Sequence, residues 1–127
     1  MNNLPAVSTI KFAKLIDTAH DKVVGLVAYR YLDHFETLEY GVSIVHPNDQ
    51  YNYTVGSEIA LTRLNAKDTY YGSISVQEAF DWVLGNDPFL KPKFTSFSRV
   101  GIQAIVCGSA ARHFHYPVFL RFTRSGV

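Results

Sequence analysis

Residues 40–64 read YGVSIVHPNDQYNYTVGSEIALTRL and predict a β-strand, a stiff polar loop and an α-helix in that order. The strand ends before Pro47, because proline has no N–H group and does not continue a central ladder. Asn48 and Asp49 form turns readily, since their side chains hydrogen-bond to nearby backbone N–H groups. A helix follows over about residues 54–66, as its apolar spacing indicates. Its predicted solvent-facing positions are Glu58, Thr62 and Asn65.

The segment before the loop predicts a β-hairpin, formed by residues 23–32 and 37–46 around a four-residue connection at 33–36. In the predicted register Arg30 lies opposite Glu39, which makes an oppositely charged cross-strand pair on one face. A slip by one residue would lose this pair and the apolar pairs of the other face together. The other predicted pairs are Leu32 with Thr37, Tyr31 with Leu38, Tyr29 with Tyr40, and Val27 with Val42.

The rest of the chain predicts shorter elements on either side of this unit. Ser75 and Glu78 have the spacing of a capping box, which indicates a helix start. Residues 102–114 fit a helix as well as a strand, because alanine and arginine favour helices. The predicted elements are a helix over 9–19, a turn segment over 68–73, a helix over 75–84 that Gly85 ends, a strand over 99–107 and a strand over 118–123.

Length and composition predict a single domain over residues 1–127 with an α+β fold. We expect an antiparallel sheet built on the hairpin, with two or three short helices packed on one face. Hydrophobic residues make up 47% of the chain and charged residues 18%, which argues against disorder. A net charge of +1 makes nucleic acid an unlikely partner. No stretch has the length of a membrane span and the N-terminus has no signal core, so we expect a cytoplasmic protein.

The stiff loop and the helix after it supply the first candidate ligand-binding residues, Asp49, Tyr51, Tyr53 and Arg63. A rigid loop that presents tyrosines binds a partner with little loss of entropy, and an arginine beside the rings supplies a charged fork. In the structural alternative, Asp49 and Arg63 form an internal clamp and both tyrosines are buried. A second candidate group combines Arg99 and Arg112 with nearby aromatic residues, because arginines and rings together hold nucleotides.

Catalytic motifs are weak in this sequence. His46, His113 and His115 could form the ligand set of a small metal-assisted hydrolase, but no metal-binding spacing supports them. Cys107 is the single cysteine, and its apolar neighbours predict a raised thiol pKa rather than an activated nucleophile. We therefore predict no enzymatic activity, no cofactor and no metal. Two edge strands and many tyrosines predict a homo-oligomer, most often a symmetric dimer.

At residues 41–64 the sequence resembles small accessory proteins of tailed bacteriophages. The shared pattern is a strand, Pro-x-Asp-x-aromatic, a glycine, an apolar pair and Arg-Leu. In this chain it is formed by Pro47-Asn48-Asp49-Gln50-Tyr51, Gly56, Ile59-Ala60 and Arg63-Leu64. The resemblance departs at Ser57, where members often carry a basic residue, so no phosphate-binding role is carried over to this helix start.

Some members of this group antagonise bacterial defence, either by binding a defence protein or by sequestering its nucleotide signal, as the Thoeris-inhibiting sponges do. The resemblance therefore implies a viral protein that acts as a stoichiometric inhibitor in the host cell cytoplasm. The expected partner is a host defence protein or a small nucleotide signal. The alternative function is the small metal-assisted hydrolase with its histidine cluster.

Overall fold

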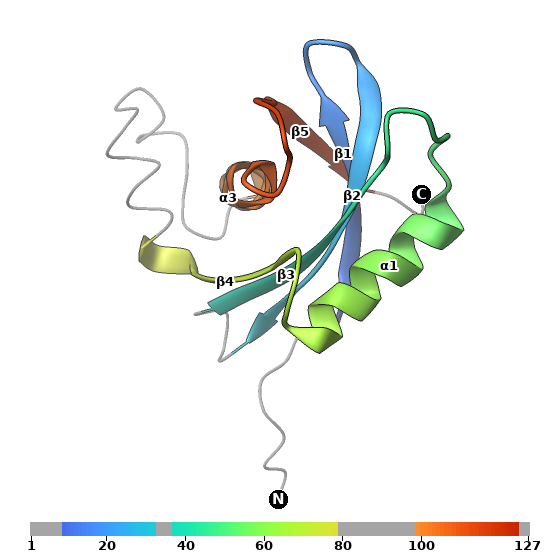
Figure 1. The fold of residues 1–127 in the computed structure, drawn as a ribbon. Coiled ribbons are helices and arrows are strands. Elements are labelled where there is room, and N and C mark those ends of the chain that lie inside the picture. The colour runs from blue at the N-terminus through green and yellow to red at the C-terminus, as the bar shows by residue number, and fades with distance from the viewer. Residues whose placement is uncertain (1–8, 33–36, 79–98, 125–127) are drawn as a thin grey trace, which may run out of the picture.

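The computed structural model describes residues 9–32, 37–78 and 99–124, which form a five-stranded antiparallel sheet and two longer helices (Figure 1). The strand order is β4-β3-β2-β1-β5. The predicted α+β fold is confirmed. The elements are β1 (Lys11–Asp17), β2 (Lys22–Leu32), β3 (Thr37–Ile44), α1 (Tyr53–Ala66), β4 (Tyr71–Ser75), α3 (Arg99–Ala111) and β5 (Leu120–Arg124).

The hairpin prediction is confirmed residue by residue. Strands β2 and β3 pair antiparallel from Leu32 and Thr37 onward, and Arg30 lies opposite Glu39 as expected. The Arg30 Nε atom donates to a Glu39 carboxylate oxygen at 3.0 Å. This register pairs Arg30 with Glu39 on one face and large apolar side chains on the other, and a slip by one residue would move each set to the opposite face.

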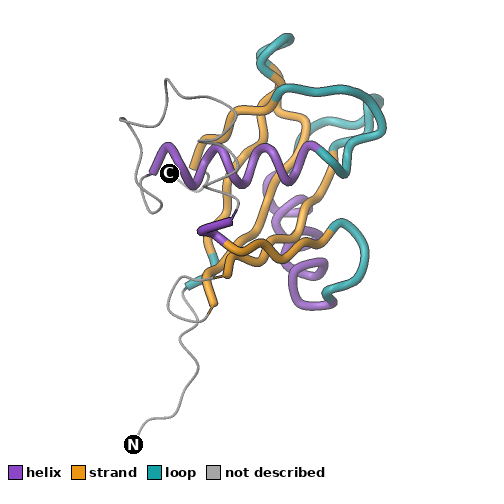
Figure 2. Tube along the Cα trace, turned by 90° about the vertical axis from the view of Figure 1, so that its left-hand side faces the viewer, coloured by secondary structure: helices purple, strands orange, loops and turns teal. Residues whose placement is uncertain are grey.

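The helices lie on opposite faces of the sheet, which corrects the expectation that they share one face. Figure 1 shows α1 on one side of the strands and α3 on the other, and Figure 2 shows one helix in front of the strands and one behind. Two separate groups of buried residues correspond to the two faces. The expectation was wrong because both faces of the hairpin are buried, including the face that carries Glu39, Gly41 and Ser43.

The face toward α3 holds the larger core, which is built from bulky side chains of the strands and of the helix. It includes Tyr29, Tyr40 and Val42 from the hairpin, packed with Val106 and Ala110 of α3. Burial of this many apolar side chains is the main stabilising contribution to a domain of this size.

The face toward α1 is closer packed and smaller. Leu26 and Ala28 of the sheet meet Ala60 and Leu64 of the helix. Gly41 lets the helix approach, because a Cβ atom there would lie 2.4 Å from the Ala60 carbonyl oxygen and 2.4 Å from the Leu64 nitrogen. The prediction of this helix over 54–66 is confirmed, and Asn52 caps it by accepting a hydrogen bond from the Val55 N–H.

The predictions for residues 9–19 and 68–73 were wrong. Residues 11–17 form strand β1 rather than part of a helix over 9–19, since β2 and β5 pair with them on either side. The apolar side chains of β1 pack on both faces of the sheet, and the pairing register shifts after Leu15. Apolar residues in this segment therefore recur at a spacing that resembles that of a helix. Residues 71–73, expected as part of a turn segment over 68–73, belong instead to β4, which pairs with β3 at the sheet edge.

In the C-terminal half, one predicted element was wrong and one is confirmed. Residues 99–111 form helix α3, so the strand prediction over 99–107 was wrong and the helical alternative was correct in kind. The strand predicted over 118–123 is confirmed as β5, which pairs with β1. Ser75 accepts a hydrogen bond from the Glu78 N–H at 3.4 Å, as a helix cap does. The rest of the helix predicted over 75–84, with its stop at Gly85, lies outside the described residues.

A charged cluster centred on the buried side chain of Glu39 lies between β2, β3 and β4 on the α1 face. Glu39 is 2% exposed and forms ion pairs with Arg30 at 3.0 Å and with Lys67 at 3.2 Å. The hydroxyl of Tyr71 donates to the same carboxylate. Lys67 ends α1 in a left-handed conformation, so this cluster also fixes the helix end against the sheet. Within the described ranges no helix is long and apolar enough to cross a membrane.

Candidate functional site

The loop after β3 is held by its own backbone, as its turn-forming residues predict. The Asp49 N–H donates to the His46 carbonyl oxygen at 2.8 Å, and the Asn48 N–H donates to His46 Nδ1 at 3.3 Å. A ring nitrogen that accepts a hydrogen bond carries no proton, so a neutral His46 has its proton on Nε2. This loop brings His46 to the border of two pockets.

The smaller pocket lies between this loop and the first turns of α1 and has a volume of about 120 Å³. Asp49 and Tyr51 border it, together with Val55 and Ile59 of the helix. The predicted group is therefore only partly assembled, since Tyr53 and Arg63 do not border this pocket. The role of the four residues in ligand binding stays a prediction.

Tyr53 and Arg63 contact other parts of the molecule. Tyr53 is 37% exposed and its ring meets that of Phe12 edge-on. The Arg63 Nη1 atom donates to the Val42 carbonyl oxygen at 2.6 Å, and its guanidinium lies 4.2 Å from the centre of the Tyr70 ring. Arg63 therefore holds α1 against β3 and the chain before β4, a role that differs from both the ligand fork and the Asp49 clamp.

The second predicted group is spread along α3. Arg99 begins the helix and Arg112 follows its end, which separates their backbones by about 20 Å at 1.5 Å per residue. Arg112 is exposed, and it lies close enough to His113 to help lower the pKa of that ring. Burial is the larger cause of the lowered His113 pKa.

The three histidines of the alternative hydrolase have different partners. His113 Nε2 lies 2.8 Å from the Tyr40 hydroxyl, and His115 Nε2 lies 3.4 Å from the Tyr70 hydroxyl. His46 instead borders the two pockets near the β3 end. Across residues 9–32, 37–78 and 99–124, no group of three His, Cys, Asp or Glu side chains is placed to hold a metal ion. Cys107 is buried, and this burial raises its pKa to about 12, as its apolar neighbours predicted.

The larger pocket has a volume of about 350 Å³ and lies between the β1–β2 turn, the end of β3 and the chain before β5. Its basic lining consists of His20, Lys22 and His46. Its apolar lining consists of Val23, Val24, Val45, Pro47 and Tyr116, and Asp17 completes the wall. A concave site with apolar walls and a few convergent polar groups is the usual form of a small-molecule site.

The aromatic wall of this pocket is formed by Tyr116, which is 45% exposed. Its ring meets that of Phe114 nearly at a right angle, with the ring centres 5.9 Å apart. Such an edge contact fixes a ring while leaving area on its faces for stacking.

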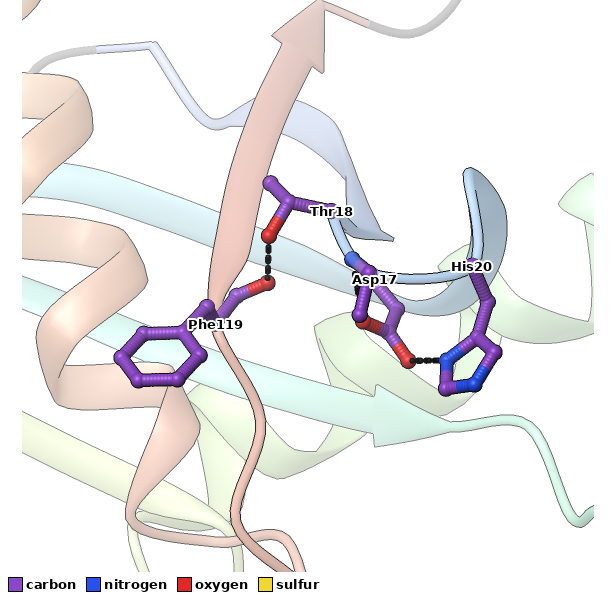
Figure 3. A network of polar contacts seen from close by, with 5 residues as sticks. Asp17, Thr18, His20 and Phe119 are labelled. Carbon is purple, nitrogen blue, oxygen red and sulfur yellow. Dashed lines mark hydrogen bonds and ion pairs between the residues drawn. The ribbon is translucent and has the colours of Figure 1, made fainter.

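Asp17 and His20 both line this pocket, and Figure 3 shows their side chains in contact. Asp17 is 6% exposed; one carboxylate oxygen lies 2.8 Å from His20 Nδ1, and the other accepts the Ala19 N–H at 3.0 Å. The hydrogen bond with His20 is the main reason that the pKa of Asp17 lies below its ordinary value of 3.8. Asp17 is therefore ionised near neutral pH, and its negative charge is directed at His20.

The turn that carries His20 also contacts the chain around the start of β5 through hydrogen bonds and an ion pair. Thr18 donates to the Phe119 carbonyl oxygen from its N–H at 3.0 Å and from its hydroxyl at 2.9 Å (Figure 3). Asp21 pairs with Arg121 at 2.5 Å. These contacts order the turn while the His20 side chain remains 76% exposed.

The sequence predictions included His46 as a metal ligand and Tyr116 as an aromatic neighbour of the C-terminal arginines, but missed Asp17, His20 and Lys22. Asp17 and His20 were assigned to a helix and its end, where a carboxylate three residues before a histidine is an ordinary surface pair. Asp21 adopts a positive φ of 49°, which asparagine and aspartate tolerate, and this turn signal was available in the sequence. Comparisons of the chain with protein-family models, with curated proteins and with solved structures find no match.

Proposed function

We propose that the protein is a non-enzymatic binding protein that takes a small planar anion, of the nucleotide class, into the larger pocket. The supporting observation is the lining itself. His20, Lys22 and His46 all border this pocket, and Tyr116 and Pro47 contribute to its apolar lining. Basic groups bind a phosphate, and an aromatic face stacks a base.

The size and charge of the pocket favour a single nucleotide. The volume of about 350 Å³ lies at the lower end of the range of about 300–1,000 Å³ for ligand pockets. Asp17, the acidic residue of the lining, is engaged by His20 and Ala19, so it opposes an anion less than a free carboxylate does.

The resemblance of residues 41–64 to phage accessory proteins extends this proposal to a biological role. A phage-encoded protein with such a pocket inhibits a host defence system by sequestering its nucleotide signal in the host cell cytoplasm. The second candidate is binding of a defence protein, which the exposed Val55 and Ile59 of α1 favour. These two residues are one helical turn apart, as in helices that dock on a partner.

Calorimetric titration with adenosine monophosphate and with adenosine tests the proposal. We expect the monophosphate to bind and adenosine to bind at least about tenfold more weakly, because a charge-assisted contact contributes more than 1.4 kcal/mol. His46→Ala and Lys22→Ala should each weaken monophosphate binding. His115→Ala is the matched control, since His115 lies outside the pocket lining. Equal affinity for the two probes, or conversion of the monophosphate to a product, would contradict the proposal.

We also propose that two chains form a symmetric dimer through a sheet edge. Strands β4 and β5 are the outer strands of the sheet, and exposed edges pair readily with another chain. Sedimentation at micromolar concentration should give twice the chain mass of 14.3 kDa. A mass equal to one chain would exclude this dimer under those conditions.

A further inference from the structure

The two histidines of the larger pocket have opposite hydrogen-bonding arrangements. His46 Nδ1 accepts the Asn48 N–H, so the neutral ring already carries a proton on Nε2 and can donate to an anion. His20 Nδ1 faces the carboxylate of Asp17 at 2.8 Å. An ionised carboxylate only accepts hydrogen bonds, so the proton of a neutral His20 ring lies on Nδ1 and its Nε2 carries a lone pair.

A lone pair on His20 Nε2 has a direct consequence for an anion in this pocket. Phosphate oxygens accept hydrogen bonds, so they repel an unprotonated Nε2 and attract a protonated one. When Nε2 takes up a proton, the ring becomes a cation held between the Asp17 carboxylate and the bound anion. The proton comes from the solvent or buffer, and the one bond formed is Nε2–H.

We propose that the Asp17–His20 pair couples anion binding to the uptake of one proton at His20 Nε2, with Asp17 as the positioning residue. This inference rests on the proposed function, because it concerns the same pocket. The Thr18 hydrogen bonds support it, because the Thr18 N–H and hydroxyl both donate to the Phe119 carbonyl oxygen and order the turn that carries His20 before a ligand arrives (Figure 3). Such preorganisation lowers the entropic cost of binding.

The other titratable and charged groups around His20 have assigned roles. Asp21 in the same turn is paired with Arg121 of β5. Lys22 at the start of β2, His46 after β3 and Tyr116 before β5 complete the lining. The Lys22 ammonium group and the His46 Nε2–H are both hydrogen-bond donors, so neither requires a new proton to meet an anion. His20 is therefore the group through which binding takes up a proton.

The first test needs no ligand. Nitrogen-15 spectra at about pH 8, where an ordinary histidine is neutral, report which ring nitrogen is protonated. We expect the proton on Nδ1 in His20 and on Nε2 in His46. Asp17→Asn should move the His20 proton to Nε2, because the asparagine oxygen keeps the Ala19 N–H and its NH₂ group then faces Nδ1. Asp21→Asn is the matched control and should leave His20 unchanged. A His20 ring with its proton on Nε2 in the natural protein would overturn the inference.

The second test measures the coupled proton. Calorimetric titrations with adenosine monophosphate and with inorganic phosphate, in two buffers of different ionisation enthalpy, should show an uptake of about one proton at that pH. The dissociation constant should then rise by about tenfold per pH unit. His20→Gln should abolish the uptake without unfolding the protein, since this side chain is 76% exposed. Asp21→Asn should retain it.

The outcomes separate this inference from the proposed function. Monophosphate binding with no proton uptake, or uptake that persists in His20→Gln, overturns the coupling and leaves the nucleotide proposal standing. Binding of inorganic phosphate with coupled uptake, but no binding of the monophosphate, supports the coupling and overturns the nucleotide proposal. No response to either probe overturns both.

Discussion

Asp17 and Glu39 are two buried carboxylates of one sheet whose partners differ in kind. Asp17 is 6% exposed and lies opposite Lys22, the first residue of β2, in the strand register. Glu39 is 2% exposed and lies opposite Arg30 near the end of that strand. Glu39 bonds to side chains from β2, β4 and the end of α1. The two described partners of the Asp17 carboxylate both lie in the adjoining turn.

The pKa values of both carboxyl groups are lowered, but the causes differ. For Glu39, burial acts to raise the pKa, and hydrogen bonds from Tyr71, Arg30 and Lys67 together outweigh it. For Asp17 the hydrogen bond with His20 dominates. A carboxylate enclosed by partners from three elements stabilises the fold, whereas one that orients an exposed histidine beside a pocket is suited to ligand binding.

The largest expected loss of stability follows removal of the Glu39 carboxylate. Glu39→Ala leaves Arg30 partly buried without its acidic partner, and loss of one member of a buried pair costs about 3–5 kcal/mol. Urea unfolding measures the change. Glu58→Ala on the exposed side of α1 is the control and should change stability by less than about 0.5 kcal/mol. A loss below about 1 kcal/mol for Glu39→Ala would remove the distinction between the two carboxylates.

A smaller loss is expected when one partner of Glu39 is removed. Tyr71→Phe deletes a hydroxyl that donates to the carboxylate, and a hydrogen bond to a charged group contributes about 1.5–3 kcal/mol. Burial and the bond to Glu39 raise the pKa of Tyr71 to about 12, and burial also raises the pKa values of Tyr40 and Tyr51. Ultraviolet titration of Tyr71→Phe should therefore show one late-ionising tyrosine fewer than the natural protein. Tyr53→Phe should leave the free energy of unfolding and the late-ionising part of the titration unchanged. Ionisation of Tyr71 near its ordinary value of 10.0 would indicate that the bond is not formed.

Acid should weaken the fold through both carboxylates. Their ordinary pKa values are 3.8 for Asp17 and 4.5 for Glu39, and both are lowered in the folded protein. The unfolded chain therefore binds more protons at low pH, and this stability is present above the ordinary values and declines as pH falls through the folded-state values. Urea midpoints measured from about pH 6 to 3 should fall, and less steeply in Glu39→Gln than in the natural protein. Identical slopes in the two proteins would contradict a role of Glu39 in acid sensitivity.

The smallest change in stability is expected on substitution of His20, the exposed partner of Asp17. His20→Gln should change the free energy of unfolding by less than about 0.5 kcal/mol, because the ring is largely exposed. The same variant should weaken binding of adenosine monophosphate. Thermal melting together with calorimetry separates these two properties. A destabilisation as large as that of Glu39→Ala would make Asp17–His20 a structural pair like the other.

The hairpin and helix α1 could be predicted from sequence because local signals agree there. Strict alternation, the Arg30–Glu39 pair and Pro47 each indicate the same register or boundary. The missed strand β1 lacks such agreement, since its apolar side chains face both helices. Helix α3 was ambiguous because its first residues alternate as in a strand, whereas Ala110, Ala111 and Arg112 favour a helix.

The candidate site was predicted only in part for a related reason. His46 and Asp49 lie in a loop with clear turn signals, so the sequence drew attention to that surface. Asp17 and Lys22 are paired across the β1–β2 turn, whose signal was missed, and Tyr116 reaches them because β5 lies beside β1 in the sheet, which no local pattern reveals. Arg63 was given a ligand role, but its hydrogen bond to the Val42 carbonyl depends on how α1 docks on β3.

The central claim is that the pocket between the β1–β2 turn and the β3 end binds a small planar anion. Amide and ring spectra of labelled protein, recorded during titration with adenosine monophosphate, test it most directly. The account predicts saturable shifts at His20, Lys22, His46 and Tyr116, with smaller changes elsewhere. Shifts centred on Val55 and Ile59 of α1, or no saturable shifts at all, would contradict it.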